Sequence, residues 1–109
     1  MIVVTTEGVP NHTISKTLGV VTGEVVYGSN VFRDFFASIR DVVGGRTKSY
    51  ERLFSNGAIQ ATEDAMERAA QAGADGIIGL RISYISIGGD RDKLFAVTAV
   101  GTAVKLAKT

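Results

Sequence analysis

Two Arg-Asp pairs, Arg33-Asp34 and Arg40-Asp41, are the densest group of chemically capable side chains in this sequence. They lie seven residues apart, so a helix would carry them on one side. An aspartate there would serve as a base, and an arginine as a clamp for an oxyanion or carboxylate. The same charges would also form an ion-pair network that fixes subunit orientation. Four alternating charges without a nucleophile or a metal fit such a network better than a catalytic site.

A glutamate within an apolar strand is the second unusual feature. We expect Glu24 to pair with an arginine, Arg33 or Arg40, across a sheet–helix interface. Tyr50 would join this cluster, although it also begins an apolar helical stripe and is more simply a core residue. No residue is assigned a catalytic role. The residues assigned to a ligand-binding or intersubunit polar cluster are Glu24, Asn30, Arg33, Asp34, Arg40, Asp41, Arg46 and Tyr50.

The segment Gly44-Gly45-Arg46-Thr47-Lys48-Ser49 combines glycines and two cations ahead of an expected helix. Such a segment can bind an anion through backbone amides and the helix dipole. It lacks the GxxxxGK[ST] spacing of a P-loop. An ordinary turn between two helices, with glycine at the end of the first, accounts for it more simply.

A metal site has little support from the donor residues. The chain has no cysteine and one histidine, whereas soft metals prefer thiolate or imidazole ligands. A ring of subunits could bring copies of His12 or Glu24 to one axis. His12 follows Pro10 and Asn11 in an expected turn, where a solvated histidine is ordinary. No cofactor is evident, and a metal ion remains a weakly supported alternative.

Length and charge limit the classes of protein that this chain can join. With 109 residues it is expected to form one domain, residues 1–109. The net charge of +1 includes no basic block, so no nucleic-acid partner is expected. No apolar run reaches the roughly 20 residues of a membrane span. The apolar start, Met1 to Val4, lacks a basic leader, so we predict a strand and a cytoplasmic protein.

Periodicity predicts two helices between two pairs of strands. The first helix begins at Asn30 as its N-cap and ends before Gly44-Gly45, with apolar residues at helical spacing between them. The second spans about 49–72, with Asp64 and Arg68 paired on its wet face and a weak point at Asn56-Gly57. Strands are expected over 2–5, 15–27, 76–87 and 93–106, the last two forming a hairpin.

The element order β-β-α-α-β-β predicts an α+β fold in which two helices cover one face of a small antiparallel sheet. Its long strands carry apolar residues on both faces, so the second face would remain apolar and uncovered. Large exposed apolar patches mark contact surfaces. We therefore expect a homo-oligomer joined through sheet faces or edges.

Several blocks resemble the YbjQ-like family of small bacterial proteins: residues 19–24, 28–36, 39–46, 49–51, 73–76 and 100–104. The resemblance implies a dodecin-like α+β subunit in a homopentameric ring. It also carries a heavy-metal-binding label without an established biochemical role. One strand departs from the family pattern, because Arg81, Ser83 and Ile85 stand where the family often has carboxylates.

Three functions follow from these observations. The first is a non-enzymatic, ring-forming protein whose assembly binds a ligand or a protein partner. The second is a heavy-metal-binding protein, which the resemblance implies. The third is an enzyme with an intersubunit site around Arg33, Asp34, Arg40 and Arg46.

Overall fold

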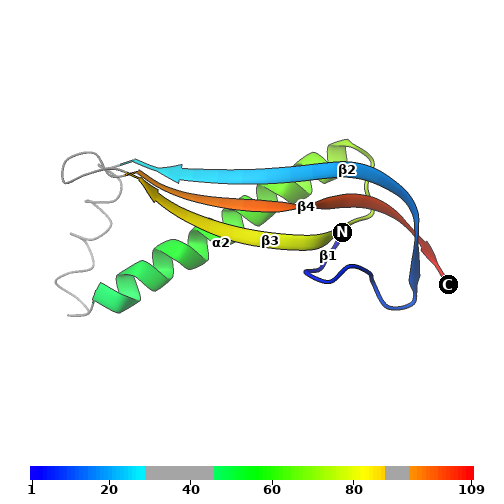
Figure 1. The fold of residues 1–109 in the computed structure, drawn as a ribbon, viewed down its shortest axis with the longest axis horizontal. Helices are drawn as coiled ribbons and strands as arrows, with labels where there is room; N and C mark the ends of the chain where they lie inside the picture. The colour runs from blue at the N-terminus through cyan, green and yellow to red at the C-terminus, as the bar shows by residue number, and fades with distance from the viewer. Residues whose placement is uncertain (29–45, 88–93) are drawn as a thin grey trace.

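The computed structural model describes the whole chain except residues 29–45 and 88–93. For residues 46–50 and 87 it describes the backbone but not the side chains. The described elements are the strands β1 (Ile2–Val3) and β2 (His12–Tyr27), the helix α2 (Arg46–Gln71), and the strands β3 (Gly76–Ile87) and β4 (Leu94–Lys108). The helix lies across one face of the sheet, which makes two layers (Figure 1). The predicted α+β class is therefore correct. The predicted helix from Asn30 lies outside the described residues, which contain one helix.

The four strands form one mixed sheet in the order β1-β3-β4-β2. β4 pairs antiparallel with β3, as predicted for the hairpin, and it also pairs antiparallel with β2. β1 instead runs parallel to β3, with Ile2 opposite Gly76. The prediction of a purely antiparallel sheet was wrong at this edge. A parallel pair needs a long connection, and the whole of β2 and α2 lies between these two strands.

The helix α2 is continuous from Arg46 to Gln71. It begins three residues before the predicted cap Ser49. It also passes without a break through Gly57, where a weak point was expected. A Cβ on Gly57 would lie 2.5 Å from Cγ2 of Val97, so the glycine allows close approach to the sheet. The predicted end is confirmed, because Gly73 has φ 84° and the N–H of Ala74 donates to the carbonyl of Ala69 at 2.9 Å.

Small residues on both layers bring the helix close to the sheet. The helix presents a row at four-residue spacing in which Ala61, Ala65 and Ala69 have no exposed surface. A Cβ on Gly23 of β2 would overlap the carbonyl oxygen of Ala61 and lie 2.7 Å from the nitrogen of Ala65. The missing side chain of Gly23 therefore allows the backbone of α2 to approach β2 closely. Leu53, 2% exposed, is buried in the same layer, whereas Ala72, just beyond the end of the helix, is exposed.

A β-bulge at Gly79 changes the inward face of β3. The register moves from Ile78 opposite Thr102 to Arg81 opposite Val100, and Gly79 has φ 62°. Two residues of β3 therefore face one residue of β4. As a result Ile77 shares the buried face with Leu80, whereas strict alternation had placed it on the opposite face with Arg81.

The sheet face turned away from α2, the outer face, alternates apolar and polar rows. Val26 and Ile85 flank Ala96 in one row, and Leu94 lies beside them. Glu24 and Ser83 flank Thr98 in the next row. The expectation of an apolar second face is met only in part. Five apolar residues of this face have 40–73% of their surface exposed: Val20, Val26, Ile85, Leu94 and Val100.

Candidate functional site

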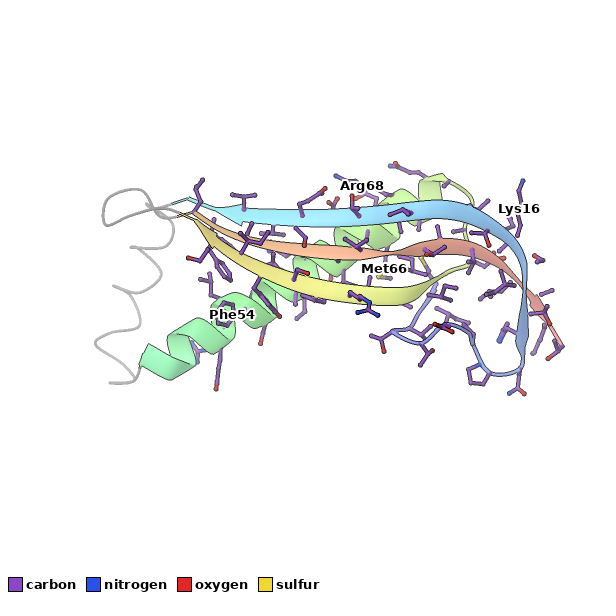
Figure 2. All side chains as sticks on the ribbon, in the orientation of Figure 1. Lys16, Phe54, Met66 and Arg68 are labelled. Carbon is purple, nitrogen blue, oxygen red and sulfur yellow. The ribbon has the colours of Figure 1, made fainter. Side chains whose placement is uncertain are left out.

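A cluster of four polar residues joins the helix α2 to the free edge of β2. We call it the edge cluster; its members are Thr22, Glu24, Asp64 and Arg68. The guanidinium Nη1 of Arg68 lies 2.9 Å from Oε2 of Glu24, and Nη2 lies 3.4 Å from Oδ2 of Asp64. The hydroxyl of Thr22 donates to Oε1 of Glu24 at 3.2 Å. Figure 2 shows Arg68 beside β2. One cation thus bridges two carboxylates on different elements.

The edge cluster also binds the backbone of β2. Nη1 of Arg68 donates to the carbonyl of Thr22 at 2.8 Å, and the N–H of Glu24 donates to Oδ2 of Asp64 at 3.2 Å. β2 is the last strand of the sheet, so these two backbone groups have no strand partner among the described residues. Side chains of α2 take the place of a fifth strand at this point.

The ion pairs of the edge cluster contribute little to stability by themselves. The side chain of Arg68 is 47% exposed and that of Glu24 is 44% exposed. Exposed pairs of this kind stabilise a protein by about 0–1 kcal/mol. The main effect of the cluster is therefore geometric: it fixes the C-terminal half of α2 over the edge of β2. Nothing in it provides a nucleophile or an open metal position.

The structure describes the side chain of one member of the predicted polar cluster, Glu24. Among the described residues its partner is Arg68; the expected partners, Arg33 and Arg40, lie outside them. The predicted pair of Asp64 and Arg68 is confirmed. Arg46 and Tyr50 belong to α2, and their side chains lie outside the described set. The other predicted members also lie outside the described residues: Asn30, Arg33, Asp34, Arg40 and Asp41.

Sequence reasoning missed the link between Glu24 and the pair on α2. Two signals were present: a carboxylate within an apolar strand, and an i, i+4 pair on the helix. Because Glu24 and Arg68 are 44 positions apart in the sequence, no local spacing connects them. Thr22 was missed as well, since a threonine in a strand is unremarkable.

Four aromatic rings form a second group, at the opposite end of the sheet–helix contact. Phe95, 4% exposed, lies between Tyr27 and Tyr84 across the sheet, with ring centroids at 6.1 and 6.3 Å. Phe54 of α2, labelled in Figure 2, contacts both Phe95 and Tyr84, with ring centroids at 4.9 and 5.0 Å. Partial burial raises the pKa of the Tyr27 phenol above its usual 10.0. This group anchors the helix and contains no pair of groups suited to acid–base catalysis.

The described residues do not provide a metal centre. They contain no group of three or more His, Cys, Asp or Glu side chains that could hold one ion. Glu24 and Asp64 already bind a guanidinium. His12 is the first residue of β2 rather than part of a turn, and its Nδ1–H donates to the carbonyl of Pro10 at 2.9 Å. A heavy-metal site needs more donors than this part of one subunit brings together.

One helix on a mixed four-stranded sheet, with an ion-pair cluster at one edge, defines a small α+β protein without a recognisable catalytic site in its described part. This chain belongs to the YbjQ family, which matches residues 1–107 and carries the description "Putative heavy-metal-binding". The resemblance stated from the sequence is thereby confirmed. Among the described residues, no helix has the length and apolar character needed to cross a membrane.

Its relatives share nearly their whole length with it. A UPF0145 protein of Trichodesmium erythraeum is 48% identical over 98% of this chain and 100% of its own. UPF0145 proteins of Nostoc punctiforme and a Synechocystis species are 50% and 49% identical, over 97% and 95% of this chain and 99% and 97% of theirs.

A solved structure shares the fold. It is the crystal structure of a protein with unknown function, of the DUF74 family, from Pediococcus pentosaceus. The two chains superpose with a TM-score of 0.67 at 18% identity, over 98% of each. At this identity the likeness concerns the fold alone.

Proposed function

We propose that this protein is a non-enzymatic subunit that assembles into a homopentameric, dodecin-like ring, and that the assembled ring binds a ligand or a protein partner. The outer face of the sheet carries the proposal. No described element covers it, although Val20, Val26, Val100, Ile85 and Leu94 are 40–73% exposed there. Side chains of this kind gathered on one face are typical of a contact surface.

The elongated shape of the subunit supports assembly. Its Cα radius of gyration is 17.0 Å, with extents of 53 × 25 × 19 Å. A compact chain of this length would have a radius of about 13 Å. Long strands covered by one described helix leave much of the sheet exposed, and association would bury that surface.

Sedimentation velocity over a range of concentrations tests this proposal. A pentamer that persists at micromolar concentration is expected. Val26→Glu and Ile85→Glu should dissociate it, because each introduces a charge into the apolar row, whereas Glu7→Gln, at an exposed turn, should leave it intact. A wild-type monomer throughout the range would contradict the proposal.

Heavy-metal binding is the second candidate, and the family description favours it. The described residues of one subunit do not bring together enough donors. Such a site would therefore need groups from several copies. Calorimetric titration with zinc, copper and nickel salts is the direct test. Heat of binding with a defined stoichiometry would support this function, and titrations indistinguishable from buffer would exclude it.

A further inference from the structure

The two edges of the sheet are protected unequally. β2, at one edge, has register irregularities between Ile14 and Lys16 and between Thr17 and Gly19. The edge cluster occupies the backbone of this strand further along, at Thr22 and Glu24. Bulges, lysines and charged groups are features that keep an edge strand from pairing with other chains. β2 has all three along its length.

The other edge is protected only over its first part. β1 consists of two residues, Ile2–Val3. The N-terminal segment that includes it bonds to β3 only as far as Leu80, whose N–H donates to the carbonyl of Val4 at 3.0 Å. From Arg81 to Ile87, no described strand lies beside β3 on the side away from β4 (Figure 1). This segment, Arg-Ile-Ser-Tyr-Ile-Ser-Ile, has no proline and a single charge at its start.

The hydrogen bonds elsewhere show which backbone groups point away from the sheet. Thr22 directs its carbonyl to α2, away from β4, so its partner Val100 bonds to β3 instead. Arg81, opposite Val100, therefore bonds to β4. By alternation, Ser83 and Ile85 also face β4. The backbone groups that point outward belong to Ile82, Tyr84 and Ser86, in agreement with the outward N–H of Leu80.

We propose that this edge of β3 binds an extended segment of another protein, which adds to the sheet as a further strand. Three outward N–H groups and three carbonyls supply the backbone bonds, as in other cases of strand addition. The partner has apolar residues at alternate positions, which lie on one face of the added strand and cover Ile85, 45% exposed on the outer face. It has a carboxylate near Arg81, which is exposed and has no ion pair among the described residues.

The position of α2 argues against a second copy of this chain as the added strand. The other described strands are short or protected, so a second copy would pair through the same segment about a twofold axis near Tyr84. Phe54 of α2 contacts Tyr84, with ring centroids 5.0 Å apart. A twofold axis there would bring the two α2 helices to nearly the same position, whereas packed helices need about 8–10 Å between axes. An extended peptide has no such helix.

Amide hydrogen exchange with the peptide acetyl-Glu-Val-Thr-Val-Thr-Val-amide at millimolar concentration tests the proposal. Exchange of the Ile82, Tyr84 and Ser86 amides should slow on the order of tenfold, the effect of about one net hydrogen bond. The Ser83 and Ile85 amides should not change, because they already face β4. The analogue acetyl-Glu-Val-Pro-Val-Pro-Val-amide, which lacks two donors, should have little effect.

Three outcomes would overturn the proposal. The peptide could leave the three outward amides unchanged, or it could slow exchange along β2 instead. The three amides could also be as slow as those of Ser83 and Ile85 before any peptide is added. That result would mean that the same chain or a second copy already occupies the edge. The state of assembly is measured separately by sedimentation, so this test stands apart from that of the proposed ring.

Two proline variants form a matched pair. Ser86→Pro removes an N–H donor that points outward at the β3 edge. Val26→Pro removes an N–H donor at the edge of β2, which also points outward because Val26 alternates with Thr22 and Glu24 along this strand. Proline is tolerated at such edge positions. Ser86→Pro should abolish the response to the peptide, and Val26→Pro should keep it. Equal responses would contradict the assignment. If Ser86→Pro does not fold, exchange in the unaltered protein decides the question.

Discussion

Replacing Gly23 by alanine tests the contact on which the sheet–helix packing depends. The new Cβ would overlap the carbonyl of Ala61 and lie 2.7 Å from the nitrogen of Ala65, whereas ordinary contacts begin at 3.4 Å. Both obstacles are backbone atoms, so no side-chain rotation relieves them. The nitrogen of Ala65 alone requires the helix to move away from β2 by about 0.7 Å, and the overlapping carbonyl oxygen of Ala61 requires a larger movement.

The expected size of the effect follows from that displacement. A radial gap of about 0.5–1 Å removes a quarter to a half of the dispersion energy of each affected contact. Forced repacking of this kind destabilises a protein by about 1–3 kcal/mol. Alanine also lowers the entropy of the unfolded chain, which offsets about 0.4–1 kcal/mol. We expect a net loss of about 1.3 kcal/mol, or a Tm lower by roughly 6 °C for a chain of this length.

The assay is thermal and urea unfolding at one fixed protein concentration, followed by circular dichroism. Gly8→Ala is the matched control, because a Cβ there has nothing within 4 Å and its φ is not in the left-handed region. The control should be neutral or stabilising by less than about 1 kcal/mol. If the two variants unfold at the same temperature, the close approach of Ala61 and Ala65 to β2 is refuted.

Three further predictions follow from the same geometry. Gly57→Ala should lower stability by about 1–3 kcal/mol in urea unfolding, because its Cβ meets Val97, even though alanine favours an isolated helix; a more stable variant would contradict this. Asp64→Ala should speed exchange of the Glu24 amide, which donates to its carboxylate, and should change global stability by no more than about 1 kcal/mol; unchanged exchange would refute the bond. Tyr27→Phe should flatten the loss of stability above about pH 10, measured by urea unfolding across alkaline pH. The raised pKa of the folded state holds the proton after the unfolded chain has released it, so the contribution of Tyr27 is full below pH 10 and is lost above it. An identical alkaline profile would contradict this.

Local patterns in the sequence predicted much of the described fold. The long strand ending at Tyr27 and the hairpin strands follow from runs of β-branched residues bounded by turns. The end of α2 follows from Gly73, and the pair of Asp64 and Arg68 from its i, i+4 spacing. Each of these signals lies within a few residues of the feature that it predicts.

The errors concern contacts between distant segments. Gly57 has the same effect on helix propensity wherever it occurs, and only the neighbouring Val97 shows that its lack of a side chain is needed for packing. The parallel pairing of β1 depends on where the chain returns after α2. Likewise Glu24 finds Arg68 only once the helix lies over the edge of the strand. None of these contacts has a local signature.

The additional residue in β3 at Gly79 has a consequence for how this strand can change in evolution. Because Gly79 and Leu80 together lie opposite one residue, Gly101, removing Gly79 would leave Ile78 opposite Thr102 and Arg81 opposite Val100, and would keep every other side chain of β3 on its present face. A single-codon deletion should therefore be better tolerated at this position of the gene than within the following codons, 81–87, where it would move every later side chain of β3 to the opposite face.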